Sequence, residues 1–148
     1  MRISRTIETS APLTKVFPYL TDFRSTNDWD PGTVRTTRSS GDGDVGTVYH
    51  NVSRFLGRET ELDYTVTELE DDERFVLHGV NQTVEATDTM TFSPTADGGT
   101  KVVYDADFRF KGVVGRVAPL LSPVLWVAFK KLGDEAEKGM QQALDGLS

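Results

Sequence analysis

From Thr33 to Lys111 the chain alternates apolar and polar residues with a period of two, and this pattern constrains the fold more than any other feature. Side chains recur on one face of a β-strand with that period. Short polar or glycine-bearing connections separate the alternating runs, which is typical of an antiparallel meander. A similar run near the N-terminus adds one more strand. The predicted strands are Arg2–Thr9, Val45–Phe55, Arg58–Leu69, Arg74–Val80, Thr83–Phe92 and Thr100–Phe110.

Two predicted hairpins agree on which face of this sheet is apolar. A two-residue turn at 71–72 places Leu77 opposite Val66, and one at 81–82 places Leu77 opposite Ala86. The shared face carries Leu62, Tyr64, Val66, Phe75, Leu77, Val84, Ala86 and Met90. The last strand has an equally apolar set in Val102, Tyr104, Ala106, Phe108 and Phe110. The reverse face is polar, so the sheet is predicted to be dry on one side and solvated on the other.

The C-terminal third of the chain returns to helical spacing. Pro119 and Pro123 are expected to break or kink an initial segment, and apolar residues then recur every three or four positions. Gly133 and Gly139 lower helix propensity by about 1 kcal/mol each relative to alanine, which predicts either a close packing contact or a bend at these positions. The apolar stripe consists of Leu125, Phe129, Leu132, Ala136, Met140, Ala143 and Leu147.

Two short helices are expected between the first strand and the meander. Val16, Phe17 and Leu20 stand at helical spacing, and Phe23–Trp29 forms a second helix ended by Asp-Pro-Gly at 30–32. The predicted order is strand, two short helices, about six more strands and a long helix. Since the sheet has one apolar face, the long helix is the element able to cover it.

Length and residue types exclude several classes of protein. The 148 residues fit one domain, 1–148, whose core needs no disulfide or metal. The chain has no cysteine and only two histidines, His50 and His78. It therefore lacks thiol nucleophiles, cysteine-ligated metals and a three-histidine metal site, and we expect no metal.

The net charge and the hydropathy of the chain indicate which kinds of partner it can bind. Sixteen Lys and Arg residues against 23 Asp and Glu residues give a net charge of −7, and the basic residues are scattered, so no nucleic-acid partner is expected. The apolar stretch Val117–Phe129 is shorter than the roughly 20 residues of a membrane span, so no stable membrane insertion is expected. The N-terminal segment lacks an apolar signal-peptide core, and a cytoplasmic location is predicted.

The segment 41–46 matches the string G-x-G-x-x-G but does not predict a nucleotide site. A phosphate-binding loop follows a strand and opens a helix, whereas here a β pattern follows and Asp42 and Asp44 would repel the phosphate. We expect a hairpin loop there and no cofactor.

Four segments give the chain a family resemblance. They are Ile-Glu-Thr-Ser-Ala-Pro at 7–12, Val-Phe-Pro-Tyr-Leu-Thr-Asp-Phe at 16–23, Trp-Asp-Pro at 29–31 and Asp-Gly-Gly-Thr-Lys-Val at 97–102. With the proline-interrupted long helix, they make nearly the whole chain resemble the START-like, polyketide cyclase/dehydrase (SRPBCC) superfamily. In that family an Ala-Pro opens the first helix, and a Trp with a nearby Pro ends the short helix pair.

The resemblance implies an α+β helix-grip fold. In it, a curved seven-stranded antiparallel sheet wraps around a long C-terminal helix, two short helices follow the first strand, and an apolar cavity lies between sheet and helix. Family members bind lipids, sterols, plant hormones or polyketides, and some catalyse aromatisation, cyclisation or dehydration. The resemblance transfers no catalytic residues to this chain, because no specific catalytic motif matches.

Asp88 is the most informative polar residue, because it interrupts an apolar series and the register points it inward. A buried carboxyl needs a partner or a raised pKa, so Asp88 is expected to orient a ligand hydroxyl, to act as an acid or base, or to pair with an arginine or water at the sheet rim. Tyr64 and Tyr104 are inward phenols that suit a pocket wall or ordinary core packing. His50 has uncertain parity and is either a base or a structural histidine.

The leading hypothesis is a protein that binds a small hydrophobic or amphipathic ligand of lipid, polyketide or aromatic type. The alternatives are a cyclase/dehydrase-like enzyme using Asp88 or His50, and a protein-interaction module. In such a module the apolar segment around Pro119 and Pro123 would make a partner or homodimer interface. Independently of that hypothesis, apolar residues of this region are expected to form a lid, a dimer contact or a shallow membrane-docking patch. The expected ligand-binding residues are Leu62, Tyr64, Val66, Leu77, Val84, Ala86, Asp88, Met90, Tyr104, Phe108, Leu125, Trp126, Phe129 and Leu132.

Overall fold

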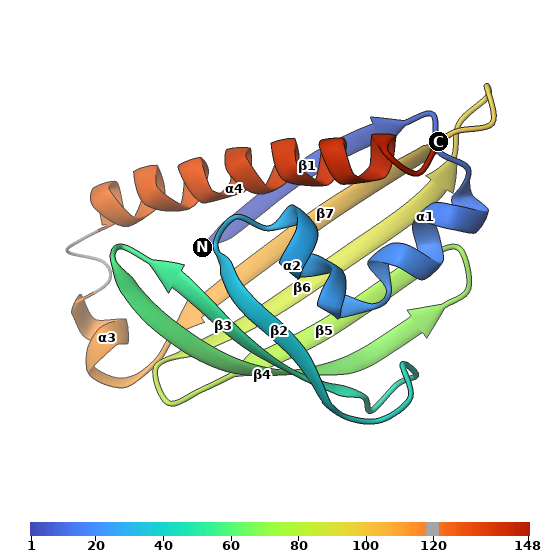
Figure 1. Ribbon diagram of the computed structural model, residues 1–148. Coiled ribbons are helices and arrows are strands. Elements are labelled where there is room, and N and C mark those ends of the chain that lie inside the picture. The colour runs from blue at the N-terminus through green and yellow to red at the C-terminus, as the bar shows by residue number, and fades with distance from the viewer. Residues whose placement is uncertain (118–121) are drawn as a thin grey trace.

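A single antiparallel sheet of seven strands forms the body of the molecule, and one long helix lies along its apolar face (Figure 1). The computed structural model describes residues 1–117 and 122–148. Neighbouring strands follow the order β1-β7-β6-β5-β4-β3-β2, so the first strand closes one edge beside the last one. This is the predicted α+β helix-grip architecture.

The elements for which the sequence predicted bounds lie close to them, whereas β2 and α3 had no predicted bounds. The strands are β1 (Arg2–Thr9), β2 (Thr33–Ser40), β3 (Val48–Phe55), β4 (Arg58–Glu70), β5 (Arg74–Val80), β6 (Val84–Pro94) and β7 (Thr100–Phe110). The helices are α1 (Leu13–Leu20), the 3-10 turn η1 (Phe23–Ser25), α2 (Thr26–Trp29), α3 (Gly112–Val117) and α4 (Ser122–Asp145). The strand predicted from Val45 begins at Val48, because the glycine-bearing loop before it is longer than expected.

The predicted pairing of β4 with β5 is confirmed. Val66 lies opposite Leu77. Glu70 pairs with Arg74, so the turn is one residue longer than predicted, and a bulge at Thr67 absorbs the extra residue.

The predicted register of β5 and β6 is wrong by two residues. Leu77 lies opposite Asp88 and not Ala86, because the connection is longer than the two residues assumed, with the N–H of Asn81 donating to the carbonyl of Val84. Side chains alternate with a period of two, so a shift of two residues leaves every side chain on its predicted face.

The start of the long helix differs from the sequence expectation at one proline. Pro123 is the second residue of α4, where its missing N–H breaks no helical hydrogen bond. Pro119 lies outside the described residues. At the N-terminal end of the chain, Pro12 stands directly before α1 with an extended backbone, as the Ala-Pro motif predicted.

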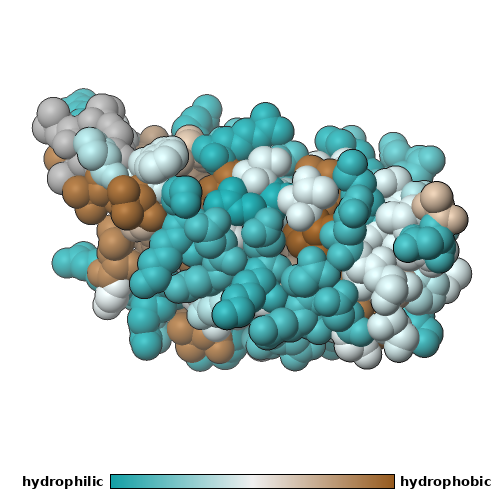
Figure 2. All heavy atoms as spheres, turned by 90° about the horizontal axis from the view of Figure 1, so that it is seen from above, coloured by the Kyte–Doolittle hydropathy of each residue, from teal (hydrophilic) through white to brown (hydrophobic). Residues whose placement is uncertain are grey.

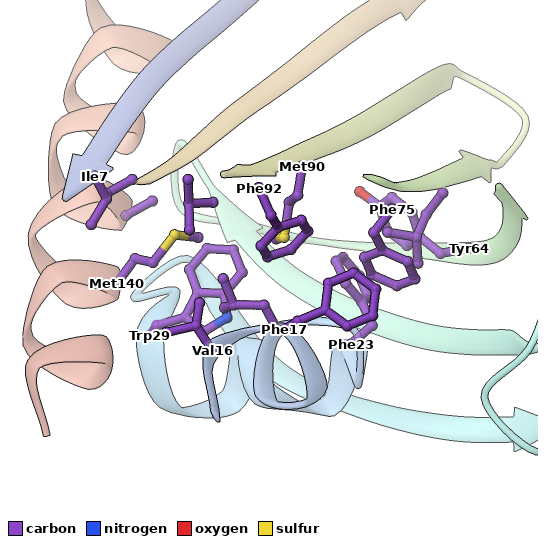
Figure 3. Packing of buried hydrophobic residues seen from close by; sticks show 14 of the residues in the cluster. Ile7, Val16, Phe17, Phe23, Trp29, Tyr64, Phe75, Met90, Phe92 and Met140 are labelled. Carbon is purple, nitrogen blue, oxygen red and sulfur yellow. The ribbon is translucent and has the colours of Figure 1, made fainter. Parts of the chain in front are cut away.

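The core is packed between the sheet, α1, η1 and the C-terminal half of α4. Figure 3 shows Met140 of α4 and Ile7 of β1 beside Trp29, with Phe17 and Val16 of α1 below Phe92. Phe17 meets Phe92 edge-on at 5.0 Å between ring centres. Among the described helices, none is long and apolar enough to pass through a lipid bilayer.

Candidate functional site

Asp88 and Tyr104 form a hydrogen-bonded pair on the inner face of the sheet. Asp88 on β6 faces Ala106 and Tyr104 on β7 faces Met90, so the two side chains are diagonal neighbours on one face. The Tyr104 hydroxyl donates to Oδ2 of Asp88 at 2.9 Å. Asp88 is only 3% exposed, so the inward orientation expected from the sequence is confirmed.

The second carboxyl oxygen of Asp88 gives this pair an unused polar atom. Within the described part of the chain, Oδ1 of Asp88 is buried and has no hydrogen-bond partner. Burial raises the pKa of Asp88 to about 7, the Tyr104 hydrogen bond opposes that rise, and the charge of Asp30 adds to it. A buried acceptor without a partner costs about 1–3 kcal/mol, which a ligand donor would recover.

The side chains of Trp29, Asp30 and Tyr64 surround this pair. The indole of Trp29 meets the ring of Tyr104 edge-on at 5.5 Å. Asp30, which follows Trp29 in the chain, accepts hydrogen bonds from the N–H of Gly32 and the hydroxyl of Thr33. Burial is the main cause that raises the pKa of Asp30.

Tyr64 on β4 completes the polar group. Burial raises the pKa of Tyr64 and of Tyr104 well above the ordinary value, and the nearby charges of Asp88 and Asp30 act in the same direction. Both phenols are therefore neutral hydrogen-bond donors over the physiological pH range.

An aromatic cluster joins the sheet to the N-terminal half of α4. Phe129 of α4 stacks on Phe55 of β3 at 4.6 Å and lies 4.8 Å from Phe108 of β7, measured between ring centres. Phe110 lies 6.1 Å from the same ring. Phe129 thus joins two strands that stand far apart in the sheet, which requires the sheet to curve around the helix.

One protein family matches nearly the whole length of the chain. The family described as "Polyketide cyclase / dehydrase and lipid transport" matches residues 1–147. The chain belongs to this family. Membership supports a role in binding a hydrophobic ligand or in cyclase chemistry. No curated protein matches the chain by sequence.

Several solved structures share the fold at low sequence identity. A protein from Thermus thermophilus has a TM-score of 0.83 and 15% identity, covering 100% of this chain and 99% of that one. The Zhui aromatase/cyclase from a Streptomyces species has a TM-score of 0.80 and 12% identity, covering 98% and 93%. A START superfamily protein from Mycobacterium smegmatis has a TM-score of 0.78 and 14% identity, covering 99% of each chain.

The predicted ligand-binding residues separate into three groups in the structure. Seven belong to the buried cluster and are closely covered by protein: Leu62, Tyr64, Val66, Leu77, Val84, Ala86 and Met90. Asp88 and Phe129 are also buried, whereas Tyr104, Phe108, Leu125 and Leu132 keep partial exposure. Trp126 is exposed on the outside of α4, because it lies off the side of the helix that faces the sheet.

His50 lies on the outer face of the sheet and not beside Asp88. Its neighbours Tyr49 and Asn51 point inward and are buried. Nδ1 of His50 lies 2.7 Å from Asp63 and Nε2 lies 2.9 Å from Glu61. These hydrogen bonds raise the pKa of His50 above its ordinary value.

Three residues near the site were not expected to belong to it. The sequence indicates Asp30 only as part of a helix end, and its charge reaches Asp88 through folding alone. Phe110 was predicted on the inner face but not as a ligand-binding residue, and Phe55 could have been found from the strand alternation, since it stands on the inward parity of its strand. Within the described residues, no trio of His, Asp or Glu side chains is arranged to hold a metal ion.

Proposed function

We propose that this protein binds a small hydrophobic or amphipathic molecule between the sheet and α4, and that Asp88 anchors a hydrogen-bond donor on it. The observation that carries the proposal is that Oδ1 of Asp88, beside the Tyr104 hydroxyl, is buried and has no partner among the described residues. An aromatic or lipid-like ligand with one hydroxyl group matches this arrangement, because its apolar body would contact the aromatic cluster while its hydroxyl donates to Asp88.

The uneven packing between sheet and helix supports the same proposal. Ile7, Leu20, Met140 and Leu144 are nearly inaccessible to solvent where the C-terminal half of α4 covers the sheet. Towards the N-terminal half of α4 the inward side chains of Tyr104, Phe108, Phe110, Phe55 and Leu132 keep partial exposure. A ligand covering these side chains would bury apolar surface, which contributes about 25 cal/mol per Å² before the costs of association.

Two aromatic probes that differ in one hydroxyl test the proposal. Binding of 2-naphthol and of 2-methoxynaphthalene is measured by fluorescence titration of the full chain. At about pH 8, above the pKa of Asp88, the carboxyl is ionised and Oδ1 is an acceptor. We then expect 2-naphthol to bind about tenfold more tightly, because only its hydroxyl donates to Oδ1 of Asp88. Native mass spectrometry of the purified protein, searched for a co-purifying apolar compound, provides a second readout.

Variants at two carboxyl groups provide the control. Asp88→Leu removes the acceptor and should abolish the preference for 2-naphthol, while Asp105→Asn on the outer face should preserve it. Asp88→Asn keeps an acceptor oxygen and should retain the preference even where Asp88→Leu fails to fold. Saturable binding of neither probe, or an equal preference in both Asp88 variants and the wild type when all are folded, would overturn the proposal.

A second candidate function is proton transfer to or from such a ligand. A carboxyl group with a pKa of about 7 exchanges its proton readily near neutral pH, which is what a general acid or base requires. Asp88 would then be the reacting group, and Tyr104 would hold its other oxygen. Turnover of a cyclisable polyketide mimic that is lost in Asp88→Asn, with binding retained, would distinguish the enzyme from the binding protein.

The partners proposed with this function are a small hydrophobic molecule and no nucleic acid, in keeping with the net charge of −7. A homodimer and a cytoplasmic location remain predictions from the sequence.

A further inference from the structure

One end of the molecule presents apolar side chains to solvent. Val124 and Trp126 are each 59% exposed, and Val127 is 62% exposed, all in the first turns of α4. Val114 and Val117 of α3, at the same end of the molecule, are also exposed (Figure 1). Figure 2 shows apolar atoms gathered at this end, while polar residues cover most of the surface over the remainder of α4. We call these five valine and tryptophan residues the apolar end.

The charges of the chain are segregated around the apolar end. The segment 108–133 contains five basic residues and no acidic residue. Since the whole chain carries −7 and this segment carries +5, the remainder carries −12. The basic residues are therefore not scattered evenly, as the composition alone suggested. The five basic residues of this segment are Arg109, Lys111, Arg116, Lys130 and Lys131.

Along α4, exposed apolar residues come first, two lysines follow and the acidic residues come after them, so the charges are also separated in space. The turn after Trp126 and Val127 carries Lys130 and Lys131, and acidic residues begin only one turn later. Each lysine lies four residues, or about 6 Å along the axis, beyond an exposed apolar residue. Lys130 and Lys131 make ion pairs of 3.4 and 3.9 Å with carboxylates of that next turn, and these pairs are exposed, so they compete weakly with another anion.

A hollow beside Trp126 adds more cationic groups. It encloses about 190 Å³ between β1 and the start of α4, and Arg2, Arg5 and Lys130 line it together with Trp126 and Phe129. Arg2 and Arg5 each pair with one aspartate, at 3.2 and 2.9 Å. A phosphate group in this hollow would face three cationic side chains and the ring of Trp126.

We propose that the protein docks on anionic lipid bilayers through the apolar end. Apolar side chains with cationic residues one turn behind them match the boundary between acyl chains and anionic headgroups, with tryptophan at its preferred depth. A second copy of the chain fits less well, because a symmetric contact would bring two segments of +5 together. Docking at this end would place the sheet–helix space next to the lipid surface.

Vesicle binding measures the proposal directly. The full chain is sedimented with vesicles of phosphatidylcholine alone or of phosphatidylcholine mixed with phosphatidylglycerol. We expect binding to the mixed vesicles that weakens as salt is added, and little binding to the neutral ones. The tryptophan emission should shift to the blue on binding, and the shift reports Trp126, because Trp29 is already buried at 1% exposure.

Matched variants separate the apolar and the electrostatic contributions. Val124→Ser/Val127→Ser should lower vesicle affinity at least tenfold, whereas Val45→Ser, equally 59% exposed but in the β2–β3 loop at the other end of the molecule, should change nothing (Figure 1). Lys130→Gln/Lys131→Gln should lower affinity for the mixed vesicles about fivefold per lysine. Lys138→Gln, further along α4, is the control for charge.

Three outcomes would overturn the docking proposal. They are equal binding to neutral and anionic vesicles, equal loss in the Val45 and Val124/Val127 variants, and a concentration-dependent dimer in light scattering that Val124→Ser/Val127→Ser abolishes. None of them bears on the ligand proposal, because the apolar end does not include Asp88 or Tyr104. We expect the docking variants to bind 2-naphthol as the wild type does. The docking proposal can therefore fail while the ligand proposal holds, and the reverse.

Discussion

Gly139 of α4 lies directly against the backbone carbonyl of Trp29 at the end of α2, with no room for a side chain between them. A Cβ at position 139 would overlap that carbonyl oxygen. The contact fixes how closely the long helix approaches the short one, and it holds Trp29 where its indole covers Tyr104. The glycine, which weakens an isolated helix, is therefore explained by close packing and not by a bend.

Gly139→Ala is expected to destabilise the protein by about 3 kcal/mol, because the overlap with backbone outweighs the gain in helix propensity. The measurement is the midpoint and slope of urea unfolding. Gly146→Ala, at the end of the same helix, has its nearest neighbour atom at 3.4 Å and serves as the control. A stability of Gly139→Ala equal to that of the control would show that α4 does not contact α2 in this way.

The burial of Asp88 predicts an unusual dependence of stability on pH. The pKa of Asp88 is raised from 3.8 to about 7 on folding, so the folded state holds a proton that the unfolded state has released across this window. Stability should therefore fall as the pH rises from about 4 to about 7, by an amount on the order of 4 kcal/mol, and then level off. Urea unfolding at a series of pH values measures this.

Asp88→Asn isolates that contribution. The variant cannot titrate, so its stability should decline less between about pH 4 and about pH 7 than that of the wild type. Asp71→Asn, in the exposed β4–β5 turn, should keep the wild-type profile. Parallel profiles for wild type and Asp88→Asn would mean that Asp88 is solvated or ionised in the folded protein.

Phe129 is expected to be the main anchor of the N-terminal half of α4. It contacts Phe55, Phe108 and Phe110, so Phe129→Ala should cost about 3–5 kcal/mol in unfolding free energy. Val127→Ala, two residues away and exposed, should stay within about 0.5 kcal/mol of wild type. A small effect of Phe129→Ala would indicate that this half of the helix is held by other contacts.

Most of the fold could be predicted from the sequence, because alternation and helical spacing report which side of each element is buried. The inner face of the sheet was predicted correctly even where the β5–β6 register was wrong, since a shift of two residues preserves the face. Tyr64 lies opposite Gly79, and its ring covers the space that a side chain at position 79 would need. The β4–β5 pairs were correct despite a bulge that no local pattern indicated.

The candidate site was harder to predict because its residues are brought together by the curvature of the sheet. The inward orientation of Asp88 follows from strand parity, but its neighbour Asp30 comes from a different part of the chain and has no periodic signal. Trp126 shows the opposite error. Its type and its position near the apolar stripe favoured a buried role, and the helix phase turns it outward.

The ion pairs of His50 predict a measurable titration on the outer face of the sheet. Its hydrogen bonds to Asp63 and Glu61 raise the pKa of His50 above 6.5, so NMR titration should place its midpoint above that value. The raised pKa of His50 stabilises the folded protein fully at pH values below the pKa of histidine in the unfolded chain. This stabilisation is lost as the pH rises through the pKa of His50 in the folded protein. The loss should be small, because the histidine side chain is 35% exposed. Asp63→Asn should lower the midpoint, Asp107→Asn on β7 should leave it unchanged, and a wild-type midpoint at or below 6.5 would mean that the histidine is unpaired in solution.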